Sequence, residues 1–489
     1  MKAIKVFAMI AFLTLAVWPS LVVPASPGAD SHVLQPEPNT HNAPINSSIL
    51  VDFGETVDLA TISENSLPIY GAQQALITGT YTISGTQIQL TPAQPFFPGE
   101  LIQSTVTTST QTITGTSLVD MPLVWQFRTA TGAASGTLFS RPWDLDTNWS
   151  EDIALGDLNA DGNLDIFLGN RDAASTVWFN AGSGHFTTNG FDLGSPFIND
   201  VSLGDMDGDG DLDAIQAGIQ NNRLWLNDGH GEFSYGGALF PGSAIIQQVA
   251  LGDLDGDGDL DAVTITACDP FDPDQACEYA VHRIWWNDGT GDLQESNQSL
   301  GHGTAADVSL GDLDGDGDLD AMVVSRLEQG SSVWMNLGGG VFTSTQTLAD
   351  LQAASVDFGD LDGDGDLDAF VAPQANTTSA VWLNDGGGTL VAGQHLENFN
   401  DVVLGDLDGD GDLDAFSANI AADKVWLNQG DATFIFSGQD LGAAISSRAA
   451  LGDLDGDGDL DAATSGYDTQ PTFWVNHLWL HTWMPIVQR

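Results

Sequence analysis

The chain has 489 residues, more than a single hydrophobic core usually supports, so two or more domains are expected. Hydrophobic residues make up 42% of it, a fraction typical of globular rather than disordered proteins. The 68 acidic residues outnumber the 11 basic ones, and the formal net charge is -57. Such a polyanion is repelled by nucleic acid and by anionic lipid surfaces, and we expect bound cations to neutralise part of its charge.

Residues 1–29 have the pattern of a signal peptide. Two lysines form a short basic start, an apolar run covers residues 6–17, and small residues follow at 25–29. The alternative is an uncleaved membrane anchor, but the apolar run is short for a span and two prolines follow it. We expect cleavage near 25–29, a mature chain without a transmembrane segment, and a protein that is secreted or at the cell surface.

Residues 33–131 are rich in Thr, Ile, Val and Gln and have no helical period. Short alternating runs bounded by Pro and Gly predict a small β-sandwich domain. Three segments resemble the bacterial Ig-like domain found in exported proteins: PINSSILVDFGETVD at 44–58, LTPAQPFFPGE at 90–100 and WQFRT at 125–129. This resemblance implies a spacer or presentation module rather than a catalyst.

The rest of the chain is dominated by a repeat. The string LGDLDGDGDLDA, or a near copy, occurs seven times, at intervals of 46–48 residues with one interval of 59, and a VWxN-like string follows each copy. Each unit predicts four short strands separated by turn residues, and seven such units are typical of a β-propeller. An open solenoid is disfavoured because its units at this length are usually helical. The predicted fold is therefore all-β: a seven-bladed β-propeller over 132–489, preceded by the Ig-like β-sandwich.

The seventh unit ends soon after FWVN at 473–476 and lacks the Gly-rich turn and fourth strand of the other units. A matching segment, GAASGTLFSRPWDL, lies at 132–145, before the first unit. We expect this segment to supply the outer strand of the last blade and so close the ring. The alternative is that the C-terminal segment 477–489 fills that edge.

Each repeat contains a tight loop with acidic residues at alternate positions from 1 to 9. Side chains at positions 1, 3, 5 and 9 converge on one point, and position 7 is expected to offer its backbone carbonyl. Oxygen ligands at this density suit calcium, and the loops contain no His or Cys for zinc or copper. An EF-hand is excluded because position 12 is not acidic in any loop and the flanking sequence is strand-like.

We expect up to seven Ca²⁺ ions, one per blade, with a weaker site in the first loop, where Asn replaces Asp at positions 3 and 7. The candidate ligands, loop by loop, are Asp157, Asn159, Asp161, Asn163 and Asp165; Asp205, Asp207, Asp209, Asp211 and Asp213; Asp253, Asp255, Asp257, Asp259 and Asp261; Asp312, Asp314, Asp316, Asp318 and Asp320; Asp360, Asp362, Asp364, Asp366 and Asp368; Asp406, Asp408, Asp410, Asp412 and Asp414; and Asp453, Asp455, Asp457, Asp459 and Asp461.

These loops resemble the FG-GAP or VCBS-type repeats that build the integrin α-subunit propeller, and the resemblance covers residues 132–489. It implies that each loop joins the first and second strands of a blade on the lower face. Calcium in such loops acts as a structural staple. The Trp that recurs once per blade is expected to pack between blades, with a carbohydrate platform as the alternative.

The third unit is 11 residues longer than its neighbours and carries CDPFDPDQAC at 268–277. In an oxidising compartment Cys268 and Cys277 are expected to form a disulfide, since two thiols alone make an improbable metal site. By the strand order of the family, this insertion lies on the face opposite the calcium loops. There it is either a specificity loop or a decorated loop without a binding role.

No HExxH, GxSxG or phosphate-loop motif occurs, and we assign no catalytic residue. The sequence favours an extracellular binding or adhesion module for a glycan or a protein. Two other hypotheses stay open: a structural surface component without a discrete ligand, and a polysaccharide-active enzyme with a carboxylate pair among its many acids.

Overall fold

The computed structural model describes residues 32–63, 65–141, 145, 149–188, 190, 193–194, 196–219, 222–240, 245–267, 280–326, 330–349, 351–374, 380–442, 445–466 and 470–476. The predicted signal peptide, the insertion at 268–277 and the segment 477–489 lie outside these residues. Within them the only helical element is the short 3-10 helix η1 (Leu59–Thr61), and no helix has the length and hydropathy of a membrane span.

The N-terminal region consists of two four-stranded sheets that share one hydrophobic core. In sheet order the strands are β1 (Val33–Gln35), β2 (Ile49–Asp52), β6 (Gln87–Pro92) and β5 (Gly79–Ser84), then β4 (Ala75–Leu76), β3 (Ile69–Gly71), β7 (Leu101–Val106) and β8 (Leu123–Arg128). Along β2 only Ile49 and Val51 are buried, because successive side chains of a strand point to opposite faces. Trp125 and Phe127 of β8 enter the same core. This two-layer arrangement is the predicted Ig-like sandwich.

Seven four-stranded antiparallel sheets follow, one for each repeat. Blades 1 to 4 consist of β10 (Ser150–Gly156), β11 (Asp165–Asn170), β12 (Thr176–Asn180) and β13 (Phe186–Thr188); β14 (Ile198–Gly204), β15 (Asp213–Gly218), β16 (Arg223–Leu226) and β17 (Ser234–Ala238); β18 (Ile245–Gly252), β19 (Asp261–Ala267), β20 (Val281–Trp286) and β21 (Gln294–His302); and β22 (Asp307–Gly311), β23 (Asp320–Val324), β24 (Ser331–Asn336) and β25 (Phe342–Leu348).

Blades 5 to 7 repeat this order, and the last blade takes its fourth strand from the N-terminal side of the propeller. Their strands are β26 (Ala353–Gly359), β27 (Asp368–Pro373), β28 (Val381–Leu383) and β29 (Val391–Ala392); β30 (Asp401–Gly405), β31 (Asp414–Ala418), β32 (Asp423–Asn428) and β33 (Phe434–Leu441); and β34 (Ser446–Gly452), β35 (Asp461–Gly466), β36 (Thr472–Asn476) and β9 (Leu138–Ser140). The predicted seven-bladed propeller is confirmed.

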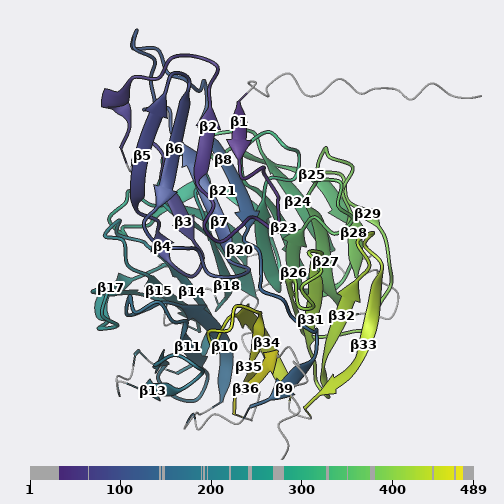
Figure 1. Cartoon of the computed structure of the whole chain (residues 1–489). Coiled ribbons are helices and arrows are strands. Elements are labelled where there is room, and N and C mark those ends of the chain that lie inside the picture. Colours follow the sequence, from purple (N-terminus) through teal and green to yellow (C-terminus); the bar gives the residue numbers. More distant parts are fainter. Residues whose placement is uncertain are drawn as a thin grey trace, which may run out of the picture.

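The seventh blade shows how the ring closes. Strand β9 pairs antiparallel with β36, with Phe139 opposite Val475 and Leu138 opposite Asn476. In Figure 1 the dark blue β9 lies among the yellow strands of the last blade. The prediction that 132–145 supplies this strand is confirmed for its central residues, and the two ends of the propeller sequence are joined in one sheet.

Hydrophobic packing between neighbouring blades forms seven clusters, and one of them joins the last blade to the first. In that cluster Ile153 and Ile166 of blade 1 meet Leu454 and Phe473 of blade 7. The recurring Trp of every blade packs in one of these clusters, as predicted: Trp178, Trp225, Trp285, Trp334, Trp382, Trp426 and Trp474.

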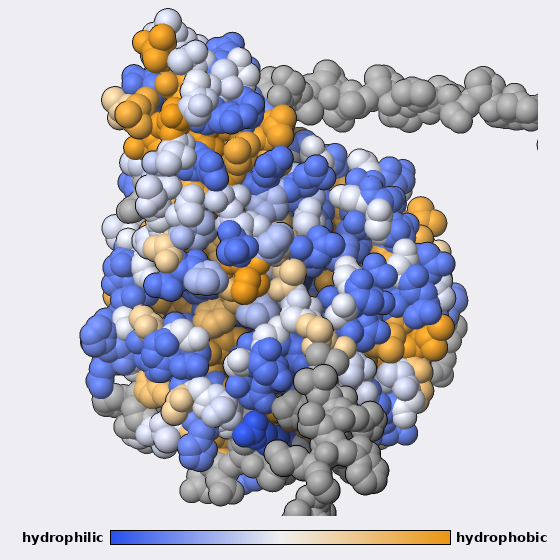
Figure 2. Space-filling view, viewed as in Figure 1, coloured by the Kyte–Doolittle hydropathy of each residue, from blue (hydrophilic) through white to orange (hydrophobic). Residues whose placement is uncertain are grey.

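The Ig-like domain sits on one face of the propeller, at the top of the view in Figure 1. The visible propeller surface is mostly hydrophilic, whereas hydrophobic residues gather on the Ig-like domain (Figure 2). Val33, Leu59 and Ile113 are its most exposed large hydrophobic residues, at 52%, 69% and 68%. Smaller hydrophobic patches also appear on the propeller (Figure 2), where Leu337, Val391 and Ile420 are exposed.

Candidate metal centres

Each acidic loop joins the first and second strands of its blade, as the family resemblance implies. In every blade the Gly that ends the first strand pairs with the Asp at loop position 9, as Gly252 pairs with Asp261 in blade 3. The intervening residues must therefore reverse the chain within eight positions. Gly256 and Gly258 make this turn at φ values of 75° and 104°, a region that favours glycine.

The Asp at position 1 organises the turn through backbone amides. In the third loop Asp253 Oδ1 accepts a hydrogen bond from Gly256 N at 2.8 Å, and Oδ2 accepts one from Gly258 N at 3.1 Å. Amides that point at a carboxylate stabilise its ionised form and fix its orientation. The loop is therefore preorganised by its own sequence.

The Asp at position 9 anchors the loop to the blade. Asp261 is fully buried; its Oδ2 accepts a hydrogen bond from Leu254 N at 3.0 Å, and its Oδ1 accepts one from Asn287 N at 2.9 Å. The same two bonds recur in all seven loops. Position 9 is buried in all seven loops, position 3 is half-buried, and position 5 is exposed.

Among the described residues, six groups of at least three metal-ligating side chains each bring one ligand atom per residue within 4.8 Å of the others. In loops 2, 3, 5 and 6 the group consists of positions 1, 3 and 9. In loop 4 it consists of positions 1, 3 and 5. The groups in loops 2 to 6 are Asp205, Asp207 and Asp213; Asp253, Asp255 and Asp261; Asp312, Asp314 and Asp316; Asp360, Asp362 and Asp368; and Asp406, Asp408 and Asp414.

These carboxyl groups are held in an environment that disfavours their ionisation. Burial raises the pKa of Asp253 to about 7 and that of Asp261 to about 9, and the neighbouring loop carboxylates add to both shifts. Burial likewise raises the pKa of Asp320 to about 9. A bound cation reverses this effect because its charge stabilises the ionised carboxylates.

Buried oxygens of the half-buried residues at position 3 test whether a metal ion fits. Asn159 Oδ1, Asp207 Oδ1 and Asp314 Oδ1 are inaccessible to solvent and have no hydrogen-bond partner among the described residues. A buried polar atom without a partner is costly unless another group satisfies it. Convergent, unsatisfied oxygens fit a calcium ion, which when bound would be held by the side chains at positions 1, 3 and 9, or at positions 1, 3 and 5 in the fourth loop.

The Asn of the VWxN string is a structural residue that the sequence analysis missed. Asn287 Nδ2 donates to Leu260 O in its own blade at 3.1 Å and to Met206 O in the preceding blade at 2.9 Å. Asn180 makes the equivalent bond across the closure, to Leu454 O at 2.8 Å. All seven blades make this inter-blade bond. The sevenfold recurrence of this Asn is the signal that identifies it.

The Ig-like domain covers the calcium-loop face of the propeller, which sequence reasoning also missed. Tyr70 donates from its hydroxyl to Gly258 O, at loop position 6, over 2.9 Å. The same position in three other loops accepts a bond from the N-terminal part of the chain. These bonds are Val124 N to Gly317 O, Asn39 Nδ2 to Gly365 O and Gly132 N to Gly458 O.

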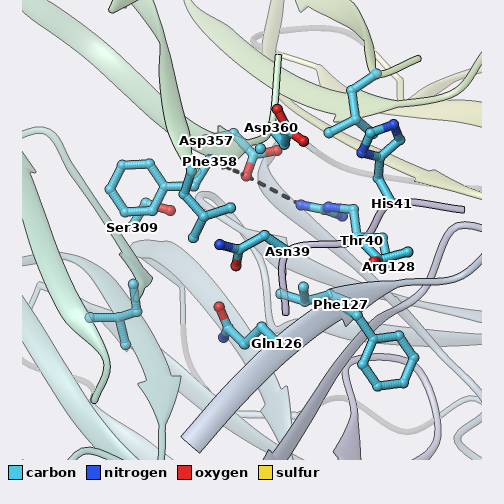
Figure 3. Close-up of a pocket in the computed structure, with 15 residues that line it drawn as sticks. Asn39, Thr40, His41, Gln126, Phe127, Arg128, Ser309, Asp357, Phe358 and Asp360 are labelled. Atoms are coloured by element: carbon cyan, nitrogen blue, oxygen red, sulfur yellow. Dashed lines mark hydrogen bonds and ion pairs between the residues drawn. The ribbon is translucent and has the colours of Figure 1, made fainter. Parts of the chain in front are cut away.

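A small cavity of about 50 Å³ lies at this interface (Figure 3). Arg128 of the Ig-like domain reaches Asp357 of blade 5 with an Nη2–Oδ1 distance of 3.4 Å, and both side chains point into the same space. Asp360, the first residue of the fifth loop, lines the same cavity. The cavity is sized for water, so here too the Ig-like domain closes against the loop face.

A further charged cluster lies at the centre of the ring. Each blade contributes to it the residue that lies five positions before the first residue of its acidic loop. Arg448 of blade 7 pairs with Asp401 of blade 6 at 3.2 Å and with Asp307 of blade 4 at 3.7 Å. It therefore reaches across a central cavity of about 320 Å³. The residues at this position in blades 1 to 7 are Asp152, Asp200, Gln248, Asp307, Ser355, Asp401 and Arg448.

Comparison with known families identifies both parts of the chain. Five stretches match the FG-GAP-like repeat: residues 157–216, 205–264, 312–371, 360–417 and 406–464. The chain belongs to the FG-GAP-like repeat family. Residues 31–129 match the bacterial Ig-like domain, so both family resemblances seen in the sequence are confirmed. A sequence comparison with curated proteins finds no match.

Solved structures similar to this FG-GAP-like repeat protein include a lectin from Agrocybe aegerita, described as recognising non-reducing terminal N-acetylglucosamine. It is 18% identical with a TM-score of 0.44, over 90% of this chain and 100% of the lectin. BBS1N in complex with ARL6DN, soaked with mercury, is 13% identical with a TM-score of 0.47, over 71% of this chain and 98% of that one.

Proposed function

We propose that this protein is an exported, calcium-stabilised module that binds a glycan or a protein outside the cell. The FG-GAP-like ring supplies a rigid frame, and seven loop ions act as staples rather than as reactants. Export is supported by the leader pattern in residues 1–29. Calcium at extracellular concentrations then offsets part of the net charge of -57.

The observation that carries the proposal is a pair of clefts of ligand size. One, of about 600 Å³, lies between the Ig-like domain and the first two blades, and another, of about 540 Å³, lies between blades 2 and 3. Binding sites for small ligands commonly have volumes of about 300–1,000 Å³ and occur at domain interfaces. The first cleft is lined in part by the first two acidic loops, including Asp157, Asp161 and Asp211, whereas no acidic-loop residue lines the second.

The test uses the mature chain from residue 30, folded in calcium, on an array of glycans and of extracellular proteins. Saturable binding in calcium that is lost in EDTA, without chemical change of the ligand, supports the proposal. Cleavage of a polysaccharide would instead favour an enzyme. A folded, calcium-loaded protein that binds nothing on either array would contradict the proposal and favour a purely structural component.

A further inference from the structure

The cleft between the Ig-like domain and blades 1 and 2 has two chemically different walls. Leu76, Pro95 and Phe97 of the Ig-like domain form an apolar side. The opposite side is acidic and comes from the first two loops, with Asp161 and Asp211 among its residues. At about 600 Å³ the cleft is large enough for several sugar units.

Hydrogen bonds hold the apolar wall rigidly. Rigidity favours binding because little conformational entropy is lost when the ligand binds. Glu100, only 1% exposed, accepts hydrogen bonds on Oε2 from Gln74 Nε2 and from Phe97 N, both at 2.9 Å. Gln74 Nε2 also donates to Pro95 O at 3.1 Å. Next to it, Gln73 O accepts a hydrogen bond from Asp157 N at 2.9 Å, which fixes the wall to the first loop.

We infer that this cleft binds a neutral oligosaccharide. This inference rests on the proposed binding function and deepens it. A sugar ring has an apolar face of C–H groups and an edge of hydroxyls. The C–H face suits Leu76, Pro95 and Phe97, while the hydroxyls donate hydrogen bonds to the carboxylates of the opposite wall.

Charge selects a neutral ligand over an acidic one. The first two loops carry three and five carboxylates, so one calcium ion in each leaves their combined charge negative. A uronate or sulfated sugar placed in the cleft would meet this like charge at short range. Neutral sugars make the same hydrogen bonds without that repulsion.

Two variants separate this site from other surfaces. Thr78 lines the cleft and is exposed there, so the larger side chain of Thr78→Trp fills part of the space. Asp211→Asn removes one charge at loop position 7, a position where the first loop already carries Asn163. The matched control is Asp366→Asn, the same change in the fifth loop, which does not line the cleft.

The experiment titrates labelled neutral tetrasaccharides of glucose, mannose, galactose and N-acetylglucosamine, with tetragalacturonate as the acidic probe, against the calcium-loaded mature protein. We expect at least one neutral probe to bind, with affinity lowered about tenfold or more by Thr78→Trp, about threefold by Asp211→Asn, and unchanged by Asp366→Asn. Melting curves in calcium check that each variant is folded. If Thr78→Trp does not fold, the difference in probe affinity between Asp211→Asn and Asp366→Asn is the deciding result.

Three results would overturn the inference. The first is that no neutral probe binds. The second is that a neutral probe binds the cleft variants with the same affinity as the Asp366→Asn control. The third is that tetragalacturonate binds more tightly than every neutral probe. In each case the array of the preceding subsection still reports separately whether the protein binds glycans or proteins at another surface. Failure of the cleft is therefore distinguishable from failure of the proposed function.

Discussion

Thr105 of the Ig-like domain donates a hydrogen bond of 2.7 Å to Oδ2 of Asp253, the first residue of the third calcium loop. Thr131 makes the equivalent contact with Asp406 Oδ2 in the sixth loop, at 3.0 Å. The two domains thus share side-chain oxygens that are also candidate calcium ligands. Because loop geometry and domain seating use the same atoms, occupancy of the loops and docking of the Ig-like domain should be thermodynamically linked.

Calcium removal is therefore expected to loosen the Ig-like domain as well as the loops. Without cations the clustered carboxylates repel one another, and the hydroxyl and amide contacts to them weaken. Hydrogen exchange measured in calcium and in EDTA should show faster exchange in β7 and β8 after chelation. Thr105→Val should produce part of this effect in calcium, whereas Thr82→Val, at an exposed position of β5 away from the loops, should not. Equal exchange in calcium and EDTA would contradict the linkage.

Asn287→Ala should destabilise the propeller strongly. The change removes both donors of the Asn287 amide and leaves Met206 O and Leu260 O without these bonds in a buried setting. We expect a loss of about 2–3 kcal/mol in the free energy of unfolding, measured by urea denaturation in calcium. The neighbouring Asp288→Ala, at an exposed position, is the control. A similar small loss in both variants would show that the inter-blade bond contributes little.

Arg448→Met should cost about 3–5 kcal/mol in the free energy of unfolding, because it leaves the buried Asp307 and Asp401 without the ion pairs that Arg448 makes with them. Arg448 opposes the burial that raises the pKa of Asp307 to about 6. The double variant Arg448→Met, Asp401→Asn should recover part of the loss, since one uncompensated charge is gone. Chemical denaturation of the single and double variants measures this coupling, and purely additive losses would argue against a charge cluster.

His282 should make stability fall in mild acid. Its Nδ1 accepts a hydrogen bond from Thr266 N at 3.2 Å, and burial lowers its pKa to about 4 from an ordinary value of 6.5. Between these pH values His282 is protonated in the unfolded chain but neutral in the folded chain. Stability is therefore lost as the pH falls from about 6.5 towards 4. His282→Asn keeps an acceptor and does not titrate.

The check is the difference in melting temperature between wild type and His282→Asn, followed from pH 7.5 to 4.5 in excess calcium. The wild type should lose stability relative to the variant as the pH falls. Acid effects on the calcium loops are common to both proteins and cancel in this difference. A difference that does not change with pH would contradict the assignment.

Repetition explains why so much of the fold was predictable. The spacing of the acidic loops gave seven blades, and the incomplete seventh unit pointed to residues 132–145 for its missing strand, which β9 supplies. Carboxylates at alternate positions of a tight loop also predict convergence without any tertiary information. The recurrent Asn of the VWxN string could have been found in the same way, because it occurs in every blade.

The remaining features are long-range and occur once. Tyr70 meets Gly258, 188 residues away, and no local pattern in either segment encodes that contact. Arg448 stands where four other blades have Asp, so an alignment of the repeats marks it as exceptional but does not reveal that it spans the ring. The interdomain cleft likewise depends on how two separate folds dock, which follows from tertiary contacts alone.

The most direct test of the account is a calcium titration of the mature protein followed by melting in calcium and in EDTA. Sites with dissociation constants of about 10⁻⁴–10⁻³ M each add about 0.4–1.4 kcal/mol at millimolar calcium, so seven sites together rival the stability of a domain. The account predicts six to seven bound ions per chain and a sharp fall in melting temperature on chelation. A chain that binds no calcium, or that melts at the same temperature in EDTA, would contradict it.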